Sequence, residues 1–182
     1  KIALAKGSSL VDTAMCSGEG GMLKESRENA NKYIYELGTA EFSHDDEAIK
    51  KADAVEIKLG QAVKIGVGGH LPAHKVTEEI AKTRGISEDE DSVSPARFHG
   101  VNSTEDLLEV VNHIREISGG VPVGIKIGAT DLDDLKEVVK AGPDFITIDC
   151  RGGGTGSTEK YLKDNIGVPA IFAIRRTRRY LD

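Results

Sequence analysis

The stretch from Val55 to Arg84 reads VEIKLGQAVKIGVGGHLPAHKVTEEIAKTR, and the rest of the chain can be organised around it. Its first residues alternate between apolar and polar, as in a β-strand, and Gly60 ends that strand. Further glycines follow up to position 69, and a helical pattern begins near Val76. Because glycine has no Cβ, a segment of this kind lets the backbone approach a ligand closely.

Cationic or titratable side chains accompany these glycines, namely Lys64, His70, His74, Lys75 and Arg84. Two interpretations of the segment are open. It is either a solvated connection between a strand and a helix, or a loop that binds an anion at the end of a strand. Spacing alone does not choose between them.

Length and composition restrict the classes of protein to consider. The chain has 182 residues, which suits one domain, and 38% of them are hydrophobic. The formal net charge of −6 and an isoelectric point near 5.4 argue against a nucleic-acid-binding surface. No apolar run is long enough to span a membrane, and no signal-peptide pattern is present. Cys16 and Cys150 lie far apart without a CxxC spacing, so we expect no metal site and a reduced, cytoplasmic setting.

Strand-like and helix-like segments alternate along the chain, which predicts βα units and a parallel sheet. The expected strands are residues 13–17, 33–37, 55–59, 122–127 and 145–148. The expected helices are residues 2–10, 24–32, 45–51, 76–83, 131–141 and 170–181. A further helix is expected to begin after Ser103, which would cap it. The run PAIFAI at 169–174 could also be a strand. Residues 87–102 are expected to form a long loop. Glycine clusters follow the strands, so the loops after them should converge on one edge of the sheet.

Three motifs together resemble the FMN-binding domain of the glutamate synthase family and its archaeal glutamate synthase-like members. They are TAMCSGEGG at 13–21, IKLGQAVKIGVGGHLP at 57–72 with IAKTRG at 80–85, and GGTG at 153–156. The segments SVSP, STEDL and VGIKIG match in the same order, so the resemblance covers nearly the whole chain. It implies an α/β fold in which residues 1–182 form a partial (β/α)8 TIM barrel. About five parallel strands would be present, with helices on the outer side, the first strand before Lys1 and the last two after Asp182.

The resemblance also implies an activity, namely the reduction of 2-iminoglutarate, formed from 2-oxoglutarate and ammonia, to glutamate by reduced FMN. The iron–sulfur cluster of glutamate synthases is implied only for parts of the protein outside this chain. Two alternatives are open. One is a flavin subunit like that of methylamine–glutamate N-methyltransferases, and the other is a non-catalytic partial barrel that needs other segments or subunits to complete it.

Residues that would bind substrate follow from the same resemblance. Lys64, His70 and Arg84 correspond to positions that hold the carboxylates of 2-oxoglutarate. A lysine offers a point charge and an arginine can bind a carboxylate with two hydrogen bonds, which agrees with this role. Position 70 is glutamine in glutamate synthases, and the histidine here leaves the substrate open.

Residues that would face the cofactor are Gln61 and Lys126, and Gly153, Gly154 and Thr155 match the loop along the ribityl chain of FMN. A lysine within the apolar run VGIKIG is costly to bury without a partner, so we expect Lys126 to stabilise the negative charge of reduced flavin rather than to be a surface residue at a strand end.

For two further residues, two roles are open. Glu105 matches a glutamate near the ammonia path of the family, so Lys126 and Glu105 are the predicted catalytic residues. Glu105 also suits the first turn of a helix, where it would have no catalytic role. Cys16 is expected to fill space in the core rather than to act as a nucleophile, because no base is placed beside it in the sequence.

Overall fold

A computed structural model describes residues 1–64, 66–129, 132–154 and 158–182. The strands are β1 (Ala14–Cys16), β2 (Lys32–Leu37), β3 (Ala54–Lys58), β4 (Gly69–Leu71), β5 (Ser92–Ser94), β6 (Val123–Gly128) and β7 (Phe145–Asp149). The helices are α1 (Ile2–Leu10), α2 (Lys24–Glu28), α3 (Asp46–Lys51), α4 (Glu78–Arg84), α5 (Thr104–Ser118), α6 (Leu132–Lys140), α7 (Lys160–Asn165) and α8 (Ala170–Leu181), with short 3-10 turns η1 (Glu41–Ser43), η2 (Ala73–Lys75) and η3 (Arg151–Gly153).

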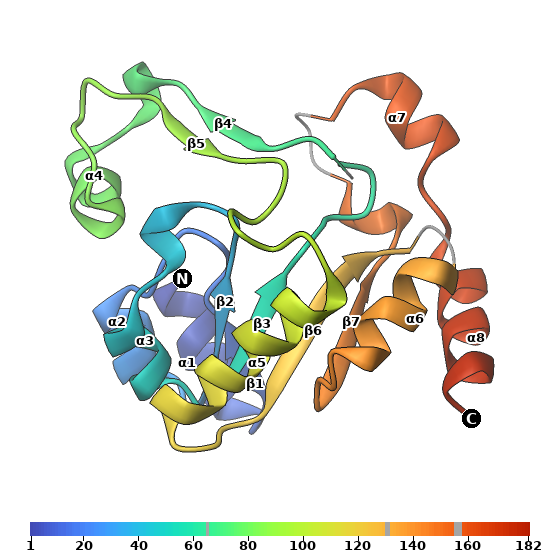
Figure 1. The fold of residues 1–182 in the computed structure, drawn as a ribbon. Coiled ribbons are helices and arrows are strands. Elements are labelled where there is room, and N and C mark those ends of the chain that lie inside the picture. The colour runs from blue at the N-terminus through green and yellow to red at the C-terminus, as the bar shows by residue number, and fades with distance from the viewer. Residues whose placement is uncertain (65, 130–131, 155–157) are drawn as a thin grey trace.

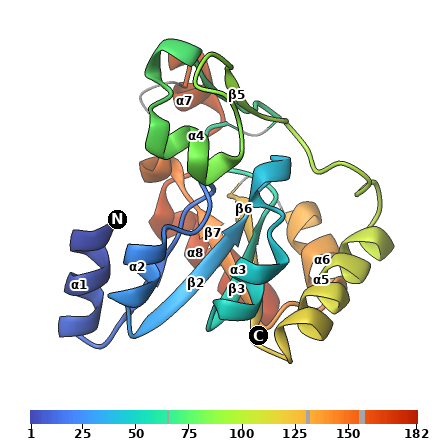
Figure 2. The ribbon, with the colours of Figure 1, turned by 90° about the vertical axis from the view of Figure 1, so that its left-hand side faces the viewer.

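The main sheet is parallel throughout and has the order β1-β2-β3-β6-β7. It curls into a half-barrel with the helices on its outer side, as Figures 1 and 2 show from two directions. Strands β1 and β7 are the two ends of this order. The predicted fold class, a partial (β/α)8 barrel with about five parallel strands, is confirmed.

The two faces of the sheet differ in chemistry because successive side chains of a strand point to opposite sides. The outer face carries the apolar core, in which Tyr35, Val55 and Ile125 are fully buried. Helices α3, α5 and α6 contribute to the same core. The inner face instead carries charged side chains, among them Glu36, Glu56, Lys58 and Lys126.

Local sequence signals account for where the longest helix begins and ends. The side chain of Ser103 accepts a hydrogen bond from the backbone of Asp106, and the side chain of Asp106 accepts one from the backbone of Ser103. This capping box satisfies two backbone N–H groups that would otherwise lack a partner. The helix ends at Gly119, whose left-handed conformation (φ 76°) favours glycine. The predicted cap at Ser103 is therefore confirmed.

An arm, which we define as residues 68–96, rises above the main sheet and differs from the prediction (Figure 1). Part of the expected loop 87–102 is strand β5, which pairs antiparallel with β4 inside the glycine-rich stretch. A Cβ at Gly68 would lie 2.1 Å from the carbonyl oxygen of Ser94. The close packing that glycine permits at position 68 is thus used for contact between two chain segments, which the pattern of residues 87–102 did not indicate.

Three other segments refine the prediction. Helix α2 ends at Glu28, earlier than expected, and β2 already begins at Lys32. Helix α7 was not predicted. The run PAIFAI belongs to helix α8 and not to a strand. No helix among the described residues is long and apolar enough to cross a membrane.

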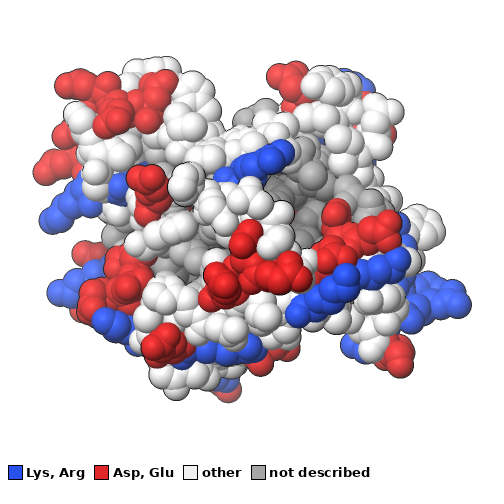
Figure 3. Space-filling view, viewed as in Figure 1, with Lys and Arg blue, Asp and Glu red and all other residues white. Residues whose placement is uncertain are grey.

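The charges on one face of the molecule are mixed. Figure 3 shows acidic side chains gathered over the arm and basic ones over the region of α8. The acidic group includes the first turn of α4, and the basic group lies in the last turns of α8. Neither sign covers the visible face continuously.

Candidate functional site

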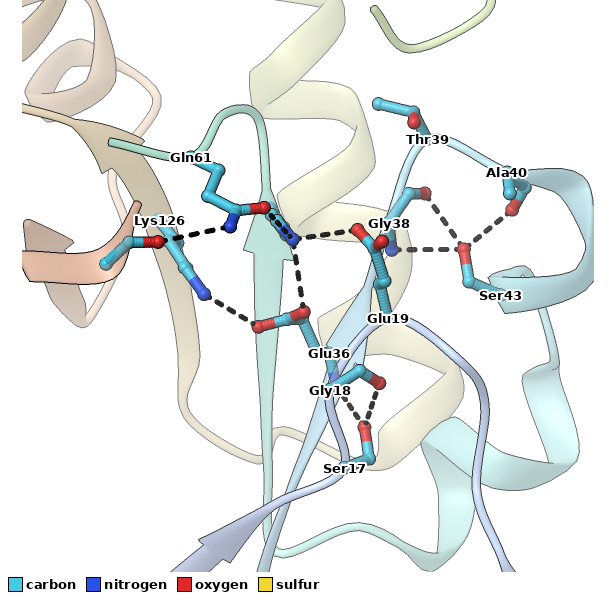
Figure 4. Close-up of polar contacts among 12 residues, drawn as sticks. Ser17, Gly18, Glu19, Glu36, Gly38, Thr39, Ala40, Ser43, Gln61 and Lys126 are labelled. Carbon is cyan, nitrogen blue, oxygen red and sulfur yellow. Dashed lines mark hydrogen bonds and ion pairs between the residues drawn. The ribbon is translucent and has the colours of Figure 1, made fainter. Parts of the chain in front are cut away.

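The candidate site lies on the inner face of the main sheet and at the edge where its strands end. The loops after β1 and β3 bring Glu19 and Gln61 to this edge, and η3 brings the backbone of Gly153 (Figure 4). The side-chain amide of Gln61 donates a hydrogen bond to the carbonyl of Gly153 at 3.3 Å. Loops that follow β1, β3 and β7 therefore meet, as the parallel order of the strands predicts.

Below this edge, charged side chains occupy neighbouring positions of the inner face. Glu36 pairs in register with Glu56, and Lys58 pairs with Lys126. Glu36 and Glu56 are 3% and 6% exposed, although carboxylates are rarely buried without partners. The predicted site residues do not include Glu36, Glu56 or Lys58. The signal that could have found them is the regular placement of charged residues between apolar ones in YIYEL and VEIKL.

Two lysines neutralise the carboxylate of Glu36 from different strands. The Nζ of Lys126 donates to its Oε2 at 3.1 Å, and the Nζ of Lys58 lies 3.9 Å from its Oε1. Lys58 also donates to Glu19 at 2.7 Å and to the side-chain oxygen of Gln61 at 3.2 Å. Figure 4 shows these contacts as a continuous series that leads from the interior to the edge. We call Glu19, Lys58, Glu36 and Lys126 the charge chain.

Environment shifts the ionisation of three inner-face groups. Burial raises the pKa of Glu56, and the neighbouring charge of Glu36 raises it further. Burial lowers the pKa of Lys126, but the charge and hydrogen bond of Glu36 outweigh this, so the pKa lies above its usual value and the side chain stays an ammonium. Partial enclosure and the carboxylate of Glu36 raise the pKa of Cys16 to about 11. The thiol of Cys16 is therefore protonated at neutral pH, which does not suit a nucleophile.

The position of Cys16 corrects one expectation. This residue is exposed on the inner face and does not belong to the apolar core. Its Sγ lies 3.8 Å from Oε2 of Glu36. The inner face of the described sheet is polar at this level, so a small polarisable side chain there contacts a carboxylate and not a hydrophobic cluster.

Hydroxyl groups fix the backbone that carries the charge chain. The Oγ of Ser17 accepts a hydrogen bond from the backbone N–H of Glu36 at 2.8 Å. The Oγ of Ser43 accepts one from the N–H of Gly38 at 3.0 Å. Both serines are buried, so these bonds hold the ends of β1 and β2 in a defined geometry.

Comparison with known proteins shows the family. The sequence profile described as the conserved region in glutamate synthase matches residues 1–182. The chain belongs to the glutamate synthase family. It is 40% identical over 176 residues to an archaeal-type glutamate synthase [NADPH] of Thermotoga neapolitana, which covers 95% of this chain and 35% of that protein. It is also 40% identical over 174 residues to an archaeal glutamate synthase [NADPH] of Archaeoglobus fulgidus, with 94% of this chain and 34% of that protein covered. The chain thus spans about a third of the length of these curated relatives.

Among solved structures, a mandelate oxidase variant with benzaldehyde is similar to this glutamate synthase-family chain. The TM-score is 0.48 at 17% identity, over 86% of this chain and 45% of the oxidase. A mandelate oxidase with 3,3-difluoro-2-hydroxy-3-phenylpropionic acid has a TM-score of 0.44 at 16% identity, over 80% of this chain and 41% of the oxidase.

The residues predicted to face a flavin lie together in this family member. Lys126 donates a hydrogen bond to Glu36, and Gln61 contacts both Lys58 and Gly153. A Cβ at Gly153 would lie 1.9 Å from a carboxylate oxygen of Asp149, and one at Gly154 would lie 2.7 Å from Val63. Both glycines are therefore closely packed against side chains of the chain itself. Thr155 lies outside the described residues.

The three residues predicted to bind substrate carboxylates are not gathered at one point. Lys64 lines a cavity of about 50 Å³ together with Glu19, Lys58 and Gln61. The Nε2 of His70, in β4, lies 2.7 Å from Oδ2 of Asp91, and both side chains are half exposed. The sequence pattern gave no sign of this pairing, because it depends on the antiparallel contact within the arm.

Arg84 makes contacts at the base of the arm. Its Nη1 donates to the Oγ of Ser92 at 2.6 Å, and its guanidinium carbon lies 4.9 Å from the ring centroid of Phe42. A Cβ at Gly20 would lie 3.3 Å from its Nη2. Arg84 therefore joins α4 to β5 and approaches the loop after β1, which carries Glu19.

Glu105 lies apart from the charge chain. It is exposed in the first turn of α5 and lines a cavity of about 690 Å³ with Phe98, Leu107 and Val138. This cavity lies between the first turn of α5 and helix α6, over the ends of β3 and β6. The structure therefore does not bring Glu105 into contact with Lys126, its partner in the predicted catalytic pair.

Proposed function

We propose that this chain contributes the flavin-facing part of an FMN-dependent enzyme that reduces 2-iminoglutarate, formed from 2-oxoglutarate and ammonia, to glutamate. The observation that carries the proposal is the match of the glutamate synthase family to all of residues 1–182. The relatives named above carry NADPH in their names, which supports NADPH as the source of electrons. Segments outside residues 1–182 would complete the barrel.

The chemistry of the inner face suits a flavin. Reduced flavin carries negative charge near N1 and the C2 carbonyl, and a cation held there stabilises it. Lys126 stays an ammonium because Glu36 accompanies it, and the amide of Gln61 adds a donor at the same edge. Gly60 lies just after strand β3, and Gly128 is the last residue of the neighbouring strand β6. Neither glycine has a side chain that would occupy the edge. In the proposed enzyme FMN would supply the transferred hydride, and Lys126 and Gln61 would hold its pyrimidine ring.

The substrate would be held by cations beside this edge. Lys64 lines the same cavity as Gln61 and Lys58, so in this proposal its ammonium would bind one carboxylate of the substrate there. Arg84 lies at the base of the arm and would bind the second carboxylate with its guanidinium. Because His70 pairs with Asp91, we assign it no direct contact with substrate in this proposal.

The test uses the full-length protein. We expect it to be isolated with FMN, to show loss of flavin absorbance with NADPH under anaerobic conditions, and to form glutamate from 2-oxoglutarate and ammonium. Purified protein without flavin, or flavin that NADPH reduces without any glutamate appearing, would contradict the proposal.

The main alternative is transfer of a group to glutamate by a methylamine–glutamate N-methyltransferase-like enzyme. His70 is the observation that favours it, because glutamine stands at this position in the glutamate synthases that the sequence resembles. Product analysis separates the two activities. Incubation with methylamine and glutamate would give N-methylglutamate in the alternative and no such product in the proposed function.

A further inference from the structure

Two buried glutamates, Glu36 and Glu56, lie side by side on the inner face of the main sheet. Glu36 in β2 and Glu56 in β3 are direct partners in the parallel register, and both side chains point to the same face. Oxygens of the two carboxyl groups and the Sγ of Cys16 lie within 4.8 Å of one another. Two carboxylates at this separation, removed from water, repel each other strongly when both are ionised.

The surroundings of the pair are unequal. Both ammonium groups of the charge chain contact Glu36, at 3.1 Å from Lys126 and 3.9 Å from Lys58. Glu56 instead accepts a hydrogen bond from the hydroxyl of Thr147 in β7. The groups that face Glu56 are thus Cys16 from β1, Glu36 from β2, Lys126 from β6 and Thr147 from β7.

The balance of charge favours a proton on Glu56. Glu19 and Glu36 carry two negative charges, and Lys58 and Lys126 carry two positive ones, so the charge chain is neutral without Glu56. A further carboxylate beside it would be a buried charge without a cation of its own, which is costly. The raised pKa of Glu56, caused first by burial and then by Glu36, agrees with this assignment.

We propose that Glu36 is a positioning residue whose ionised carboxylate holds the ammonium groups of Lys58 and Lys126, and that Glu56 is its neutral, protonated partner. The carboxylic acid of Glu56 donates its proton in a hydrogen bond to Glu36 and so helps to fix that carboxylate. The role toward the flavin rests on the proposed function, because it is through Lys126 that Glu36 acts. The protonation of Glu56 does not depend on it.

The proposal predicts unequal effects of two isosteric substitutions in the full-length protein. Glu56→Gln keeps the size of the neutral acid and an N–H donor toward Glu36. Glu36→Gln removes the charge that holds two lysines. We expect Glu36→Gln to lower kcat by about tenfold to a hundredfold, the effect of losing a charge-assisted hydrogen bond. The loss of kcat in Glu56→Gln should be at least about tenfold smaller, with KM for 2-oxoglutarate little changed in both.

A spectroscopic measurement tests the proton independently of activity. We expect the infrared spectrum of the wild type at neutral pH to contain the C=O band of a protonated carboxylic acid that shifts in D2O. The band should be absent in Glu56→Gln. It should also disappear in Glu36→Gln, because Glu56 then ionises to pair with the lysines. Glu47→Gln, an exposed acid on α3, is the matched control and should keep the band.

These experiments distinguish a failure of the roles assigned to Glu36 and Glu56 from a failure of the proposed enzymatic function. A wild type without the band, or equal losses of kcat in the two variants, would overturn the roles assigned here. If Glu36→Gln does not fold, the band of the wild type and its loss in Glu56→Gln still decide the question. If the protein shows the band but forms no glutamate, the protonated Glu56 would be supported and the proposed function would be contradicted.

Discussion

The Nζ of Lys126 lies 3.1 Å from Oε2 of Glu36, although 90 residues separate them in the sequence. The two side chains come from strands that are not neighbours in the sheet, since β3 lies between β2 and β6. They meet because the sheet curls and both project from its inner face. The lysine that the sequence predicts to face a flavin is thus held by a carboxylate that the sequence analysis did not select.

The proposed binding of substrate by Arg84 can be distinguished from its structural hydrogen bond to Ser92. If it binds a substrate carboxylate, Arg84→Ala in the full-length protein should raise KM for 2-oxoglutarate about tenfold to a hundredfold, the equivalent of about 1.5–3 kcal/mol. The FMN content should stay normal. Ser92→Ala is the control, because it removes the hydrogen bond from Arg84 to β5 and leaves the guanidinium in place. Equal changes of KM in both variants would mean that Arg84 only holds the arm.

Gly68 is expected to be required for the antiparallel pairing of the arm. A Cβ there would lie 2.1 Å from a backbone oxygen of Ser94, so Gly68→Ala should separate β4 from β5. Hydrogen–deuterium exchange should then become faster at the backbone amides of residues 69–71 and 92–94. Gly7→Ala is the matched control, because nothing lies within 4 Å of a Cβ at Gly7 in the middle of α1. Unchanged exchange in Gly68→Ala would show that the arm tolerates a side chain at this point.

Glu56 should make stability depend on pH in a defined direction. Its raised pKa means that the folded state binds the proton more tightly than the unfolded state does. The resulting stabilisation is present below the pKa of the unfolded state and is lost as the pH rises through the pKa of the folded state. We therefore expect the free energy of unfolding of the full-length wild type to fall over this range, and that of Glu56→Gln to fall less. Urea unfolding at a series of pH values measures both, and parallel curves would contradict the assignment.

Binding of FMN by residues 1–182 alone should be weak. The phosphate of a cofactor in such barrels usually lies on loops after the seventh and eighth barrel strands. The main sheet described here has five strands, and the strand labelled β7 is the fifth of them, because β4 and β5 form a separate sheet. We expect a fluorescence titration of the isolated chain to give a Kd weaker than about 1 μM, with light scattering reporting association through the unpaired strand edges. A monomer that binds FMN more tightly would place the phosphate site within these residues.

The sequence by itself determined the elements whose causes are local. Alternation in YIYEL and VEIK predicted strands, Ser103 predicted the start of α5, and the glycines after strands predicted the edge where the loops meet. These signals act within a few residues, through side-chain direction and backbone hydrogen bonds, and are therefore visible without a structure. The order of the motifs also pointed to the family and to Lys126 and Gln61 as residues that face the flavin.

Only the tertiary structure decided which distant side chains share a contact. The strand register places Glu36 beside Glu56 and brings both lysines to one carboxylate, whereas the same charged residues in the sequence could have been solvated strand positions. The pairing of β4 with β5 took His70 to Asp91, and the outer position of α5 kept Glu105 away from Lys126. The physical reason is that register, curl and antiparallel contact are set by packing across the whole sheet, so no local pattern records them.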